Sequence, residues 1–377
     1  MAKLTIKNWK SDLVSTEFIF SQSYMKLDPY SLSAKVKSEE IFQLLMSLTD
    51  YHLINNPEYR NILLSYNYAK SNTSELHDFP FLPVRIFKEI SLITNPANNL
   101  TRNVTSSGTT GQNTSVITID AETSLLQKKA LVKILSHYLG KNRRPMLVID
   151  KESTVTNRNV LSARSAGIRG FGNFASEIIY ALNEDMSVNW DAIGNFVNVN
   201  RGLDVFVFGF TAITWLHLIE EMQSNDLRID IQNAIFFHGG GWKKIAEEKR
   251  VTKMEFKSAI KNRMGISKVH DYYGMAEQTG SISIECDFGY MHTSIFSEII
   301  IRNPLTHEIC EPGQLGLIET ISVLQKSYPG HVLLTEDLGR LIGVDDCKCG
   351  KLGTYFVIEG RIKKAELRGC SDTYQVN

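Results

Sequence analysis

The sequence predicts an α/β fold in which a mixed sheet leads into a smaller β subdomain. The chain has 377 residues and is 43% hydrophobic, enough for a large core and about two or three domains. From about residue 100, short β-rich runs alternate with longer amphipathic helical patterns, which is typical of α/β proteins. After about residue 285, turn signals separate mainly β-like runs.

The first region, residues 1–95, is predicted to be a helical unit that packs on the core. In "SEEIFQLLMSLTDYHLI" the apolar residues follow helical spacing, and Ser38 stands where an N-cap is expected. Two prolines, Pro80 and Pro83, interrupt "FPFLPVRIFKEI". Because proline stops a helix, this segment should be an extended lead-in.

Residues 96–284 are predicted to form the α/β core. Strands are expected at four apolar or β-branched runs: 116–120, 145–150, 203–210 and 233–241. Helices are expected at 121–140 and 211–224. Two of the strands, 203–210 and 233–241, run directly into glycine, and in such folds ligands bind in the loops that follow the strands.

The sequence after residue 284 is predicted to form a smaller β subdomain that closes the ligand site of the α/β core. Residues 285–360 are expected to form a mixed or antiparallel β subdomain, built from the runs that begin near 297, 313, 331 and 353. Residues 361–377 are expected to be a hinge remnant and a short tail.

Composition excludes several classes of partner and location. Lysine plus arginine and aspartate plus glutamate each total 41, so a zero net charge gives no reason to expect a nucleic-acid partner. The first residues lack the apolar run of a signal peptide, and no run reaches the roughly 18 apolar residues of a membrane span. Five cysteines, an odd number, argue against a disulfide scaffold. We therefore expect a cytoplasmic protein.

The loop "TSSGTTGQNTS" at 105–115 combines glycines with hydroxyl side chains. Backbone N–H groups and hydroxyls in such a loop can converge on phosphate oxygens. It has neither the Gly-Lys-Ser/Thr ending of a P-loop nor a GxGxxG fingerprint, and a flexible surface loop explains the composition equally well. The candidate phosphate-binding residues are Thr105, Ser106, Ser107, Gly108, Thr109, Thr110 and Gly111.

Two further stretches contain chemistry that a nucleotide site would use. Glu277 follows a Tyr-Gly turn in "DYYGMAEQTG", where a carboxylate can hold Mg²⁺ against a phosphate. The glycines in "FHGGGWK" allow a flat ring to approach the backbone; they are Gly239, Gly240 and Gly241. A simple turn is the competing interpretation of both stretches.

Two charged residues near the end of the chain complete the set. Asp337 in "LLTEDLGR" is placed at a strand end, where a carboxylate can accept hydrogen bonds from ribose hydroxyls. Arg361 follows Gly360 in "EGRIKKAELRG". Taken alone, each is equally well explained as a strand end or a solvated charge.

The order of these five motifs resembles that of the adenylate-forming superfamily of acyl-CoA synthetases. The resemblance implies that the loop from Thr105 to Gly111 embraces the phosphates of ATP and that the three glycines lie by the adenine. It also implies the roles of the remaining motif residues: Tyr273, Gly274 and Glu277 near Mg²⁺, Asp337 on the ribose, and Gly360 with Arg361 at a hinge.

A narrower resemblance is to the phenylacetate–CoA ligase branch and, within it, to the acyl-protein synthetase (LuxE) family. The segments "FPFLPVRIFK", "SSGTTGQ", "HGGGWK" and "RGCSDTY" carry it. It implies the large domain of an adenylate-forming enzyme and an ATP-dependent ligase that turns a fatty acid into an acyl-adenylate and passes the acyl group to a thiol.

Three features depart from the superfamily pattern. Gln112 stands where many relatives place a lysine after the glycine loop. The chain ends at Asn377, soon after Arg361, so the small C-terminal domain with its catalytic lysine is expected to be essentially absent. Cys370 in "RGCSD" matches the acylated cysteine of the acyl-protein synthetases locally.

The acceptor of the acyl group is a thiol of unspecified origin. Cys370, coenzyme A and the phosphopantetheine of an acyl carrier protein all qualify, and an inert Cys370 on a tail is the competing interpretation. One alternative function is an acyl-carrying subunit of a fatty acid reductase complex with little adenylation of its own. A kinase-like phosphotransferase is disfavoured, because the P-loop lysine is missing.

Two remaining patterns suggest further sites. Cys286 and His292 in "ECDFGYMH", with Cys347 and Cys349 in "DDCKCG", have spacings suited to a structural Cys₃His zinc site; ordinary unpaired thiols are the alternative. Residues 167–172 and the run "VFVFGF" could line an acyl pocket, although a helix-start loop and a core strand explain them better.

Overall fold

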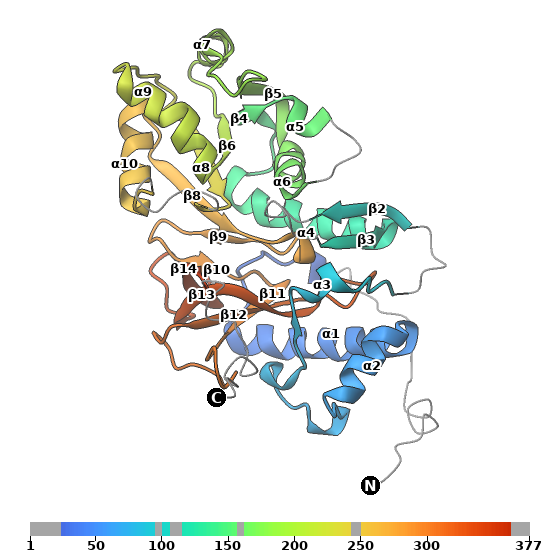
Figure 1. Ribbon diagram of the computed structural model, residues 1–377. Helices are drawn as coiled ribbons and strands as arrows, with labels where there is room; N and C mark the ends of the chain where they lie inside the picture. Colours follow the sequence, from blue (N-terminus) through green and yellow to red (C-terminus); the bar gives the residue numbers. More distant parts are fainter. Residues whose placement is uncertain (1–23, 95–99, 106–114, 157–161, 243–249, 363–377) are drawn as a thin grey trace, which may run out of the picture.

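The computed structural model describes residues 24–94, 100–105, 115–156, 162–242 and 250–362. Within these ranges, twelve strands form one sheet, which runs from the upper to the lower part of the molecule in Figure 1. The strand order is β5-β4-β6-β7-β8-β9-β10-β14-β13-β12-β11, with β1 paired to β13. A separate antiparallel hairpin consists of β2 (Leu100–Thr105) and β3 (Val116–Asp120).

The first half of the sheet is parallel. Its strands are β5 (Ala175–Leu182), β4 (Arg144–Lys151), β6 (Phe206–Phe210), β7 (Ile235–Gly239) and β8 (Lys268–Tyr273). The predicted strands at 116–120, 145–150, 203–210 and 233–241 all occur, and the last two begin slightly later than expected. Two of the five parallel strands, β5 and β8, were not among those expected.

Helices cover both faces of the parallel half, as the α/β prediction requires. Met146 and Val148 of β4 pack toward α4 (Ala121–Leu139) and α6 (Ala163–Gly172), whereas the intervening Leu147 and Ile149 pack toward the opposite layer. That layer contains α7 (Trp190–Val199), α9 (Glu220–Ser224) and α10 (Lys253–Met264). The helix expected at 211–224 forms as α8 (Thr211–Ile213), a π-helical turn η5 (Thr214–Ile219) and α9.

The second half of the sheet is antiparallel from β8 onward. It comprises β9 (Ser283–Glu285), β10 (Met291–His292), β14 (Thr354–Arg361), β13 (Val332–Val344), β12 (Gly316–Ser322) and β11 (Ser297–Arg302). The four β runs predicted after residue 285 are therefore confirmed as strands. They extend the same hydrogen-bonded sheet that begins in the parallel half.

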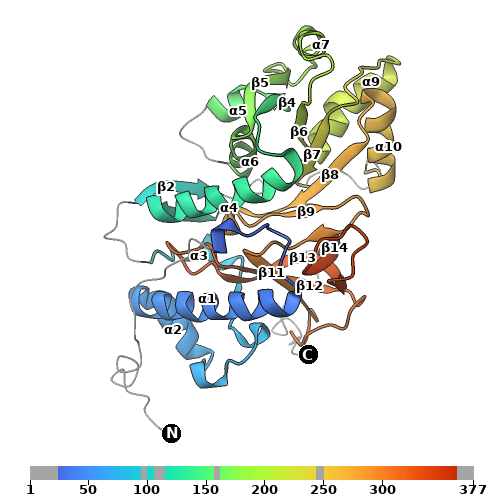
Figure 2. The same ribbon diagram turned by 180° about the vertical axis from the view of Figure 1, so that it is seen from behind.

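The N-terminal helices cover the antiparallel half. α1 (Ala34–Asn55) and α2 (Pro57–Ser65) lie against β11–β13, and Figure 2 shows α1 along this layer from behind. Ile41 and Leu45 of α1 are fully buried in the main core. The remaining short elements are η2 (Tyr24–Lys26), η3 (Lys70–Asn72), η4 (Leu76–Asp78), β1 (Leu82–Pro83), α3 (Ile86–Glu89), α5 (Ser153–Thr156) and η7 (Ala276–Gln278).

The predicted start of α1 was wrong by one turn. The helix begins at Ala34, so Ser38 lies inside it. The N–H of Ala34 donates to both carboxylate oxygens of Asp345 at 3.0 Å, from the loop between β13 and β14. An acidic group at a helix N-terminus satisfies a free N–H and interacts favourably with the helix dipole. A residue distant in sequence thus supplies the anchor that Ser38 was expected to provide.

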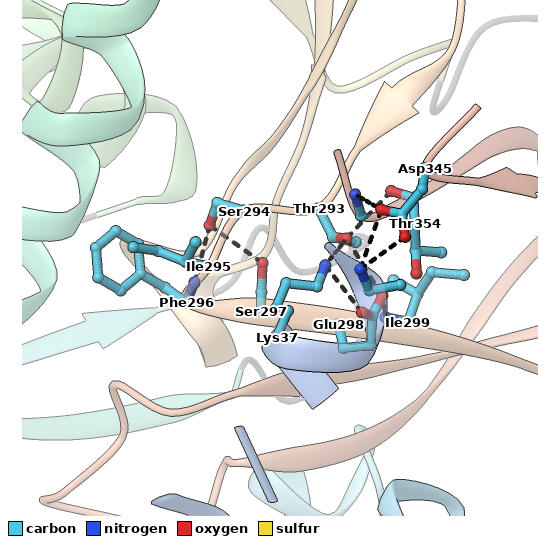
Figure 3. A network of polar contacts seen from close by, with 12 residues as sticks. Lys37, Thr293, Ser294, Ile295, Phe296, Ser297, Glu298, Ile299, Asp345 and Thr354 are labelled. Atoms are coloured by element: carbon cyan, nitrogen blue, oxygen red, sulfur yellow. Dashed lines mark hydrogen bonds and ion pairs between the residues drawn. The ribbon is translucent and has the colours of Figure 1, made fainter. Parts of the chain in front are cut away.

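A buried lysine joins α1 to the antiparallel half of the sheet. Lys37 is 1% exposed, and its Nζ lies 2.8 Å from Oε2 of Glu298 and 2.6 Å from Oγ1 of Thr293 (Figure 3). The Thr293 hydroxyl also donates to the carbonyl of Thr354 at 3.1 Å. Since a buried charge is costly unless it is paired, this network fixes the helix on the sheet.

No helix in the described part of the chain is both long enough and apolar enough to cross a bilayer.

Candidate functional site

The carboxyl ends of three parallel strands meet at one edge of the sheet. Phe210 at the end of β6 pairs with Gly239 at the end of β7, and Gly239 pairs with Tyr272 of β8. The loops that leave these strands therefore lie side by side. In open α/β sheets this is the edge at which ligands bind.

The glycines after β7 are required by the backbone. A Cβ on Gly239 would lie 2.6 Å from the Tyr272 ring and 2.8 Å from the Tyr272 carbonyl oxygen, which is closer than any side chain tolerates. Gly240 and Gly241 have φ angles of 81° and 57°, in the left-handed region that favours glycine. The predicted turn exists, and it leaves the backbone uncovered at the ligand-binding edge.

Three of the predicted site residues form one polar cluster. The Tyr273 hydroxyl donates to Oδ2 of Asp337 at 2.9 Å, and Nε of Arg361 lies 3.2 Å from Oδ1 of the same carboxylate. Asp337 lies within β13 and not at the strand end where it was expected. It is paired with Arg361 of β14, so the sheet register places the two residues opposite each other. Burial and the neighbouring Asp337 charge raise the pKa of Tyr273, which keeps the phenol protonated as a donor.

Arg361 is also held by a second acidic residue. Its Nη2 lies 3.6 Å from Glu336, which forms a further ion pair with Arg85 at 3.2 Å. The Arg361 side chain is 45% exposed, so solvent screens these pairs and they contribute little to stability. Exposure of this guanidinium leaves it accessible to an anionic ligand.

Glu277 lies in η7, directly after the turn at Gly274. It is 5% exposed, and its carbonyl accepts a hydrogen bond from the Tyr328 hydroxyl at 2.9 Å. The neighbouring Gln278 side chain donates to the carbonyls of Thr320 and Gly330. The backbone is thus fixed, whereas no described residue donates a hydrogen bond to the Glu277 carboxylate. An almost buried carboxylate without a donor is suited to binding a cation.

The predicted phosphate loop lies largely outside the described residues. Thr105 ends β2, while Ser106, Ser107, Gly108, Thr109, Thr110 and Gly111 fall in the part that is not described, as does Gln112. The hairpin on either side is placed: Thr105 pairs with Val116. Two β3 residues, Ile117 and Ile119, share a hydrophobic cluster with Ala276 of η7. The hairpin that carries the loop therefore packs into the same hydrophobic cluster as η7, the element that contains Glu277.

Aromatic side chains gather near the end of β6 and β8. A Cβ on Gly167 would lie 3.2 Å from the Tyr272 hydroxyl and 3.3 Å from the ring of Phe210. Phe208 and Phe171, one strand residue and one helix residue, are almost fully buried and belong to the core. Two stretches were considered for an acyl pocket, residues 167–172 and 205–210. Only Gly167, at the start of the first, and Phe210, at the end of the second, lie at the ligand-binding edge.

Sequence reasoning did not single out Asp271, although it lies next to Tyr272 on β8. Its Oδ1 is 3.7 Å from Nδ1 of the buried His238, and its N–H donates to Glu285 at 3.1 Å. Burial raises the pKa of Asp271 to about 7 and lowers that of His238 to about 3. His238 also contacts the Thr211 hydroxyl at 2.9 Å and the Phe256 ring, so it is a packing residue. The signal for Asp271 is a carboxylate near the end of a strand, directly before the Tyr-Tyr-Gly turn.

The four residues of the predicted metal site come together. Cys286, His292, Cys347 and Cys349 place their ligand atoms within 4.8 Å of one another. Cys370 lies outside the described residues.

Comparisons with known proteins agree with this architecture. The chain matches the acyl-protein synthetase, LuxE, family over residues 6–376. No curated protein matches it. 2-Hydroxyisobutyryl-CoA ligase in the postadenylation state with 2-HIB-AMP aligns over 92% of this chain and 73% of its own, with 16% identity and a TM-score of 0.68. In the thioesterification state, with 2-HIB-AMP and CoA, it aligns over 93% and 74%, with 17% identity and a TM-score of 0.68.

At these identities the structural likeness establishes the fold, and the family match covers nearly the whole chain. The predicted fold, that of the adenylate-forming enzymes, is confirmed. The chain belongs to the acyl-protein synthetase (LuxE) family and is an AMP-forming acyl ligase.

Proposed function

We propose that the protein uses ATP to activate a fatty acid as an acyl-adenylate and then transfers the acyl group to a thiol. The observation that carries this proposal is the convergence of Tyr273, Asp337 and Arg361 beside the strand-end glycines. Tyr273 and Asp337 are 64 positions apart in the sequence. The family resemblance places Asp337 on the ribose, Tyr273 near Mg²⁺ and Arg361 at the hinge. A carboxylate acceptor, a phenol donor and an exposed guanidinium together suit a ribose next to phosphates.

The nucleotide would lie across the ends of β7 and β8. The turn formed by Gly239, Gly240 and Gly241, of which the last two are exposed, receives the adenine, and Asp337 accepts from the ribose hydroxyls. The loop from Thr105 to Gly111 embraces the phosphates; the hairpin that carries it shares a hydrophobic cluster with η7, which supports this placement. Arg361 neutralises charge on the phosphates from the opposite side.

The Glu277 carboxylate would hold Mg²⁺. Its fit rests on the nearly buried carboxylate, which has no hydrogen-bond donor among the described residues. When bound, Mg²⁺ neutralises phosphate charge during the attack. The fixed backbone of η7 keeps the Glu277 side chain directed to one position, because Tyr328 and Gln278 hold both sides of that turn.

The first chemical step is nucleophilic substitution at the α-phosphorus. An oxygen of the fatty acid carboxylate forms a bond to the α-phosphorus, the bond to the bridging oxygen breaks, and pyrophosphate leaves. Both reactants are negatively charged, so positioning and charge neutralisation supply most of the catalysis. The loop at 105–111, Glu277 and Arg361 are the residues of this chain assigned to that task.

The acyl chain would enter along the aromatic side of the same edge. A Cβ on Gly167 would lie 3.2 Å from the Tyr272 hydroxyl and 3.3 Å from the Phe210 ring, so these two aromatic side chains pack closely on Gly167 next to the strand ends and form an aromatic wall there. Apolar and aromatic walls are typical of sites for hydrocarbon chains. This wall supports a fatty acid as the carboxylic acid substrate.

The second step transfers the acyl group to sulfur. A thiolate attacks the carbonyl carbon of the acyl-adenylate, a thioester bond forms, and AMP leaves with the oxygen that had joined it to the acyl group. The acceptor thiol is Cys370, coenzyme A or the phosphopantetheine of an acyl carrier protein. The family match to acyl-protein synthetases supports a protein thiol.

The test measures adenylation and acylation separately in the full chain. Fatty-acid-dependent exchange of labelled pyrophosphate into ATP should occur without any partner, and radioactive fatty acid should label the protein when Cys370 is the acceptor. A Cys370→Ser variant should then keep the exchange and lose the label, whereas undiminished label would assign the acceptor elsewhere. Exchange that requires a reductase partner would instead favour an acyl-carrying subunit, and formation of ADP would overturn the proposal.

A further inference from the structure

Four metal-binding side chains converge at the end of the antiparallel half of the sheet. Sγ of Cys286 lies 3.9 Å from Sγ of Cys347, and Sγ of Cys349 lies 3.3 Å from Nε2 of His292. All four ligand atoms lie within 4.8 Å of one another. Cys286 is 1% exposed and His292 is 0% exposed, so this is an interior cluster.

These distances are close to those around a tetrahedral zinc ion. Zinc binds sulfur at about 2.3 Å and imidazole nitrogen at about 2.0 Å, so two sulfurs on one ion lie about 3.8 Å apart and a sulfur and a nitrogen about 3.6 Å apart. The observed separations for Cys286 with Cys347 and for Cys349 with His292 are within a few tenths of an ångström of these values.

The two segments that carry the cysteines have the same backbone turn. The carbonyl of Cys286 accepts from the N–H of Gly289 at 2.9 Å, and that of Cys347 accepts from the N–H of Gly350 at 3.0 Å. The two glycines have φ angles of 84° and 79°. Two matching tight turns, each beginning at a cysteine, face each other across the sheet and direct their sulfurs to one point.

The histidine is oriented by its ring contacts. The His292 ring stacks on Tyr355 at 5.5 Å between centroids, with an interplanar angle of 21°, and meets the Tyr30 ring edge-on. These contacts direct Nε2 toward Cys349. Nδ1 is buried and has no hydrogen-bond partner within the described part of the chain.

A disulfide explains the cluster less well. The described cysteines are all free, and the 3.9 Å between Cys286 and Cys347 is almost twice the length of about 2.05 Å in an S–S bond. A disulfide would also use two of the thiols and leave a third thiol with the imidazole unexplained. We propose that Cys286, His292, Cys347 and Cys349 bind one Zn²⁺ in a closed, structural Cys₃His site.

The position of the site indicates a structural role. Asp337 and Arg361 pair near one end of the β13–β14 hairpin, and Val344 and Thr354 pair near the other, beside the cysteines. Seven strand residues at about 3.3 Å each separate the two ends by roughly 20 Å. The ion would therefore not reach the reacting groups, and four protein ligands leave it no open position.

The site would instead fix three parts of the molecule to one another. Cys286 and His292 flank the turn between β9 and β10, and Cys347 and Cys349 lie in the loop between β13 and β14. That loop contains Asp345, whose carboxylate accepts from Ala34 at the start of α1 and from Gly353 at 2.7 Å. Figure 3 shows Asp345 close to Thr293 and Thr354, the contacts of the Lys37 network. A metal ion here anchors the loop that caps α1.

The first test is the metal content of the full chain, purified with a reducing agent and without chelator. We expect about one zinc per chain in the natural protein and in a Cys310→Ser control, because Cys310 is a buried free cysteine outside the cluster. A Cys349→Ser variant should lose more than about half of the zinc. Less than about half an equivalent in the natural protein, or unchanged zinc in Cys349→Ser, would overturn the proposal.

A second measurement uses the natural protein alone and does not depend on whether a variant folds. Titration with an organic mercurial, with a coloured zinc indicator present, should release about one zinc per chain as the cluster thiols react. Release of no zinc from the folded chain would contradict the site. Loss of two thiols to alkylation under non-reducing conditions, with no metal present, would assign Cys286 and Cys347 to a disulfide instead. None of these readouts depends on ligase activity.

Discussion

The Tyr273 hydroxyl and the Asp337 carboxylate form a 2.9 Å hydrogen bond that joins strands β8 and β13, which are separated by β9, β10 and β14 in the sheet. The two residues are 64 positions apart, and the segment between them includes most of the antiparallel strands. The bond therefore joins the last parallel strand directly to the far hairpin at the edge where the nucleotide is proposed to bind. Arg361 occupies the second oxygen of the same carboxylate.

Removing this hydrogen bond should weaken ATP binding. In Tyr273→Phe, Asp337 loses a neutral donor, and a hydrogen bond to a charged group contributes about 1.5–3 kcal/mol. We expect KM for ATP to rise about 10-fold or more with little change in kcat. The matched control is Tyr66→Phe, since the Tyr66 side chain is 50% exposed and belongs to α2's C-terminal end. An unchanged KM in a folded Tyr273→Phe protein would refute the assignment of Asp337 to the nucleotide.

Replacing Glu277 should lower the exchange activity without lowering the free energy of unfolding. In Glu277→Gln the charge disappears, but no hydrogen bond from a described residue to the carboxylate is lost. The free energy of unfolding without Mg²⁺ should stay the same or rise, because an almost buried charge has been removed. Pyrophosphate exchange should fall about 100-fold, and more Mg²⁺ should be needed.

Urea unfolding and a Mg²⁺ titration of the exchange rate check this prediction. Glu122→Gln is the matched control, because Glu122 is 64% exposed and pairs with Lys326 at the surface. If Glu277→Gln retained the natural Mg²⁺ dependence, Glu277 would not be the metal-binding carboxylate.

Two glycine substitutions should have opposite effects on stability. Gly239→Ala places a methyl group 2.6 Å from the Tyr272 ring, so β7 and β8 must separate, at a cost of about 1–3 kcal/mol and with a loss of ATP binding. In Gly194→Ala the methyl group has no neighbour within 4 Å in the middle of α7, and stability should rise by up to about 1 kcal/mol. Thermal unfolding temperatures of both variants test this prediction. Equal changes in stability in Gly239→Ala and Gly194→Ala would contradict the described packing of β7 on β8.

Acid should destabilise the fold through two stacked histidines. His52 and His331 lie 5.0 Å apart between ring centroids and are fully buried; burial lowers the pKa of His52 and lowers that of His331 to about 3. An unfolded histidine takes up a proton near pH 6.5, and the folded one does not. The stabilising contribution is therefore complete above about pH 6.5 and is lost as the pH falls from 6.5 toward 3, by on the order of 1 kcal/mol per pH unit for each ring.

Urea midpoints at pH 7.5 and pH 5.5 measure this effect. The natural protein and a His307→Gln control, with an exposed histidine, should lose stability between the two values. His331→Gln should start from a lower stability, because contacts with Thr49 and Tyr59 are lost, but should change less with pH. An identical pH dependence in His331→Gln would show that this ring is not responsible.

The sequence was informative where a local pattern determines structure. The apolar runs that became β4, β6 and β7 are strands buried on both faces, and such strands are recognisable because consecutive positions are mostly apolar. The turn after β7 followed from its three glycines, two of which need positive φ. The Cys/His cluster was expected from spacing, and its four residues do meet.

Contacts between distant segments could not be predicted from local patterns. Asp345 accepts from the N–H of Ala34 at the start of α1, although the two residues are 311 positions apart. The expected N-cap, Ser38, was therefore wrong. The burial of Lys37 depends on its partner Glu298, which lies on β11, far from Lys37 in the sequence. The sequence around Asp271 gives no sign of a raised pKa. The pKa is raised because the fold buries this carboxyl beside His238 and Glu285.

Fatty-acid-dependent pyrophosphate exchange in Asp337→Asn tests the central claim most directly, because Asp337 joins Tyr273 and Arg361 in one cluster. The natural chain and an Asp204→Asn control, whose side chain is 71% exposed, should exchange pyrophosphate into ATP only when fatty acid is present. Asp337→Asn should lower kcat/KM for ATP by about 10- to 100-fold while the protein stays folded. Exchange at the natural rate in Asp337→Asn, or no exchange in the natural chain with any fatty acid, would contradict the account.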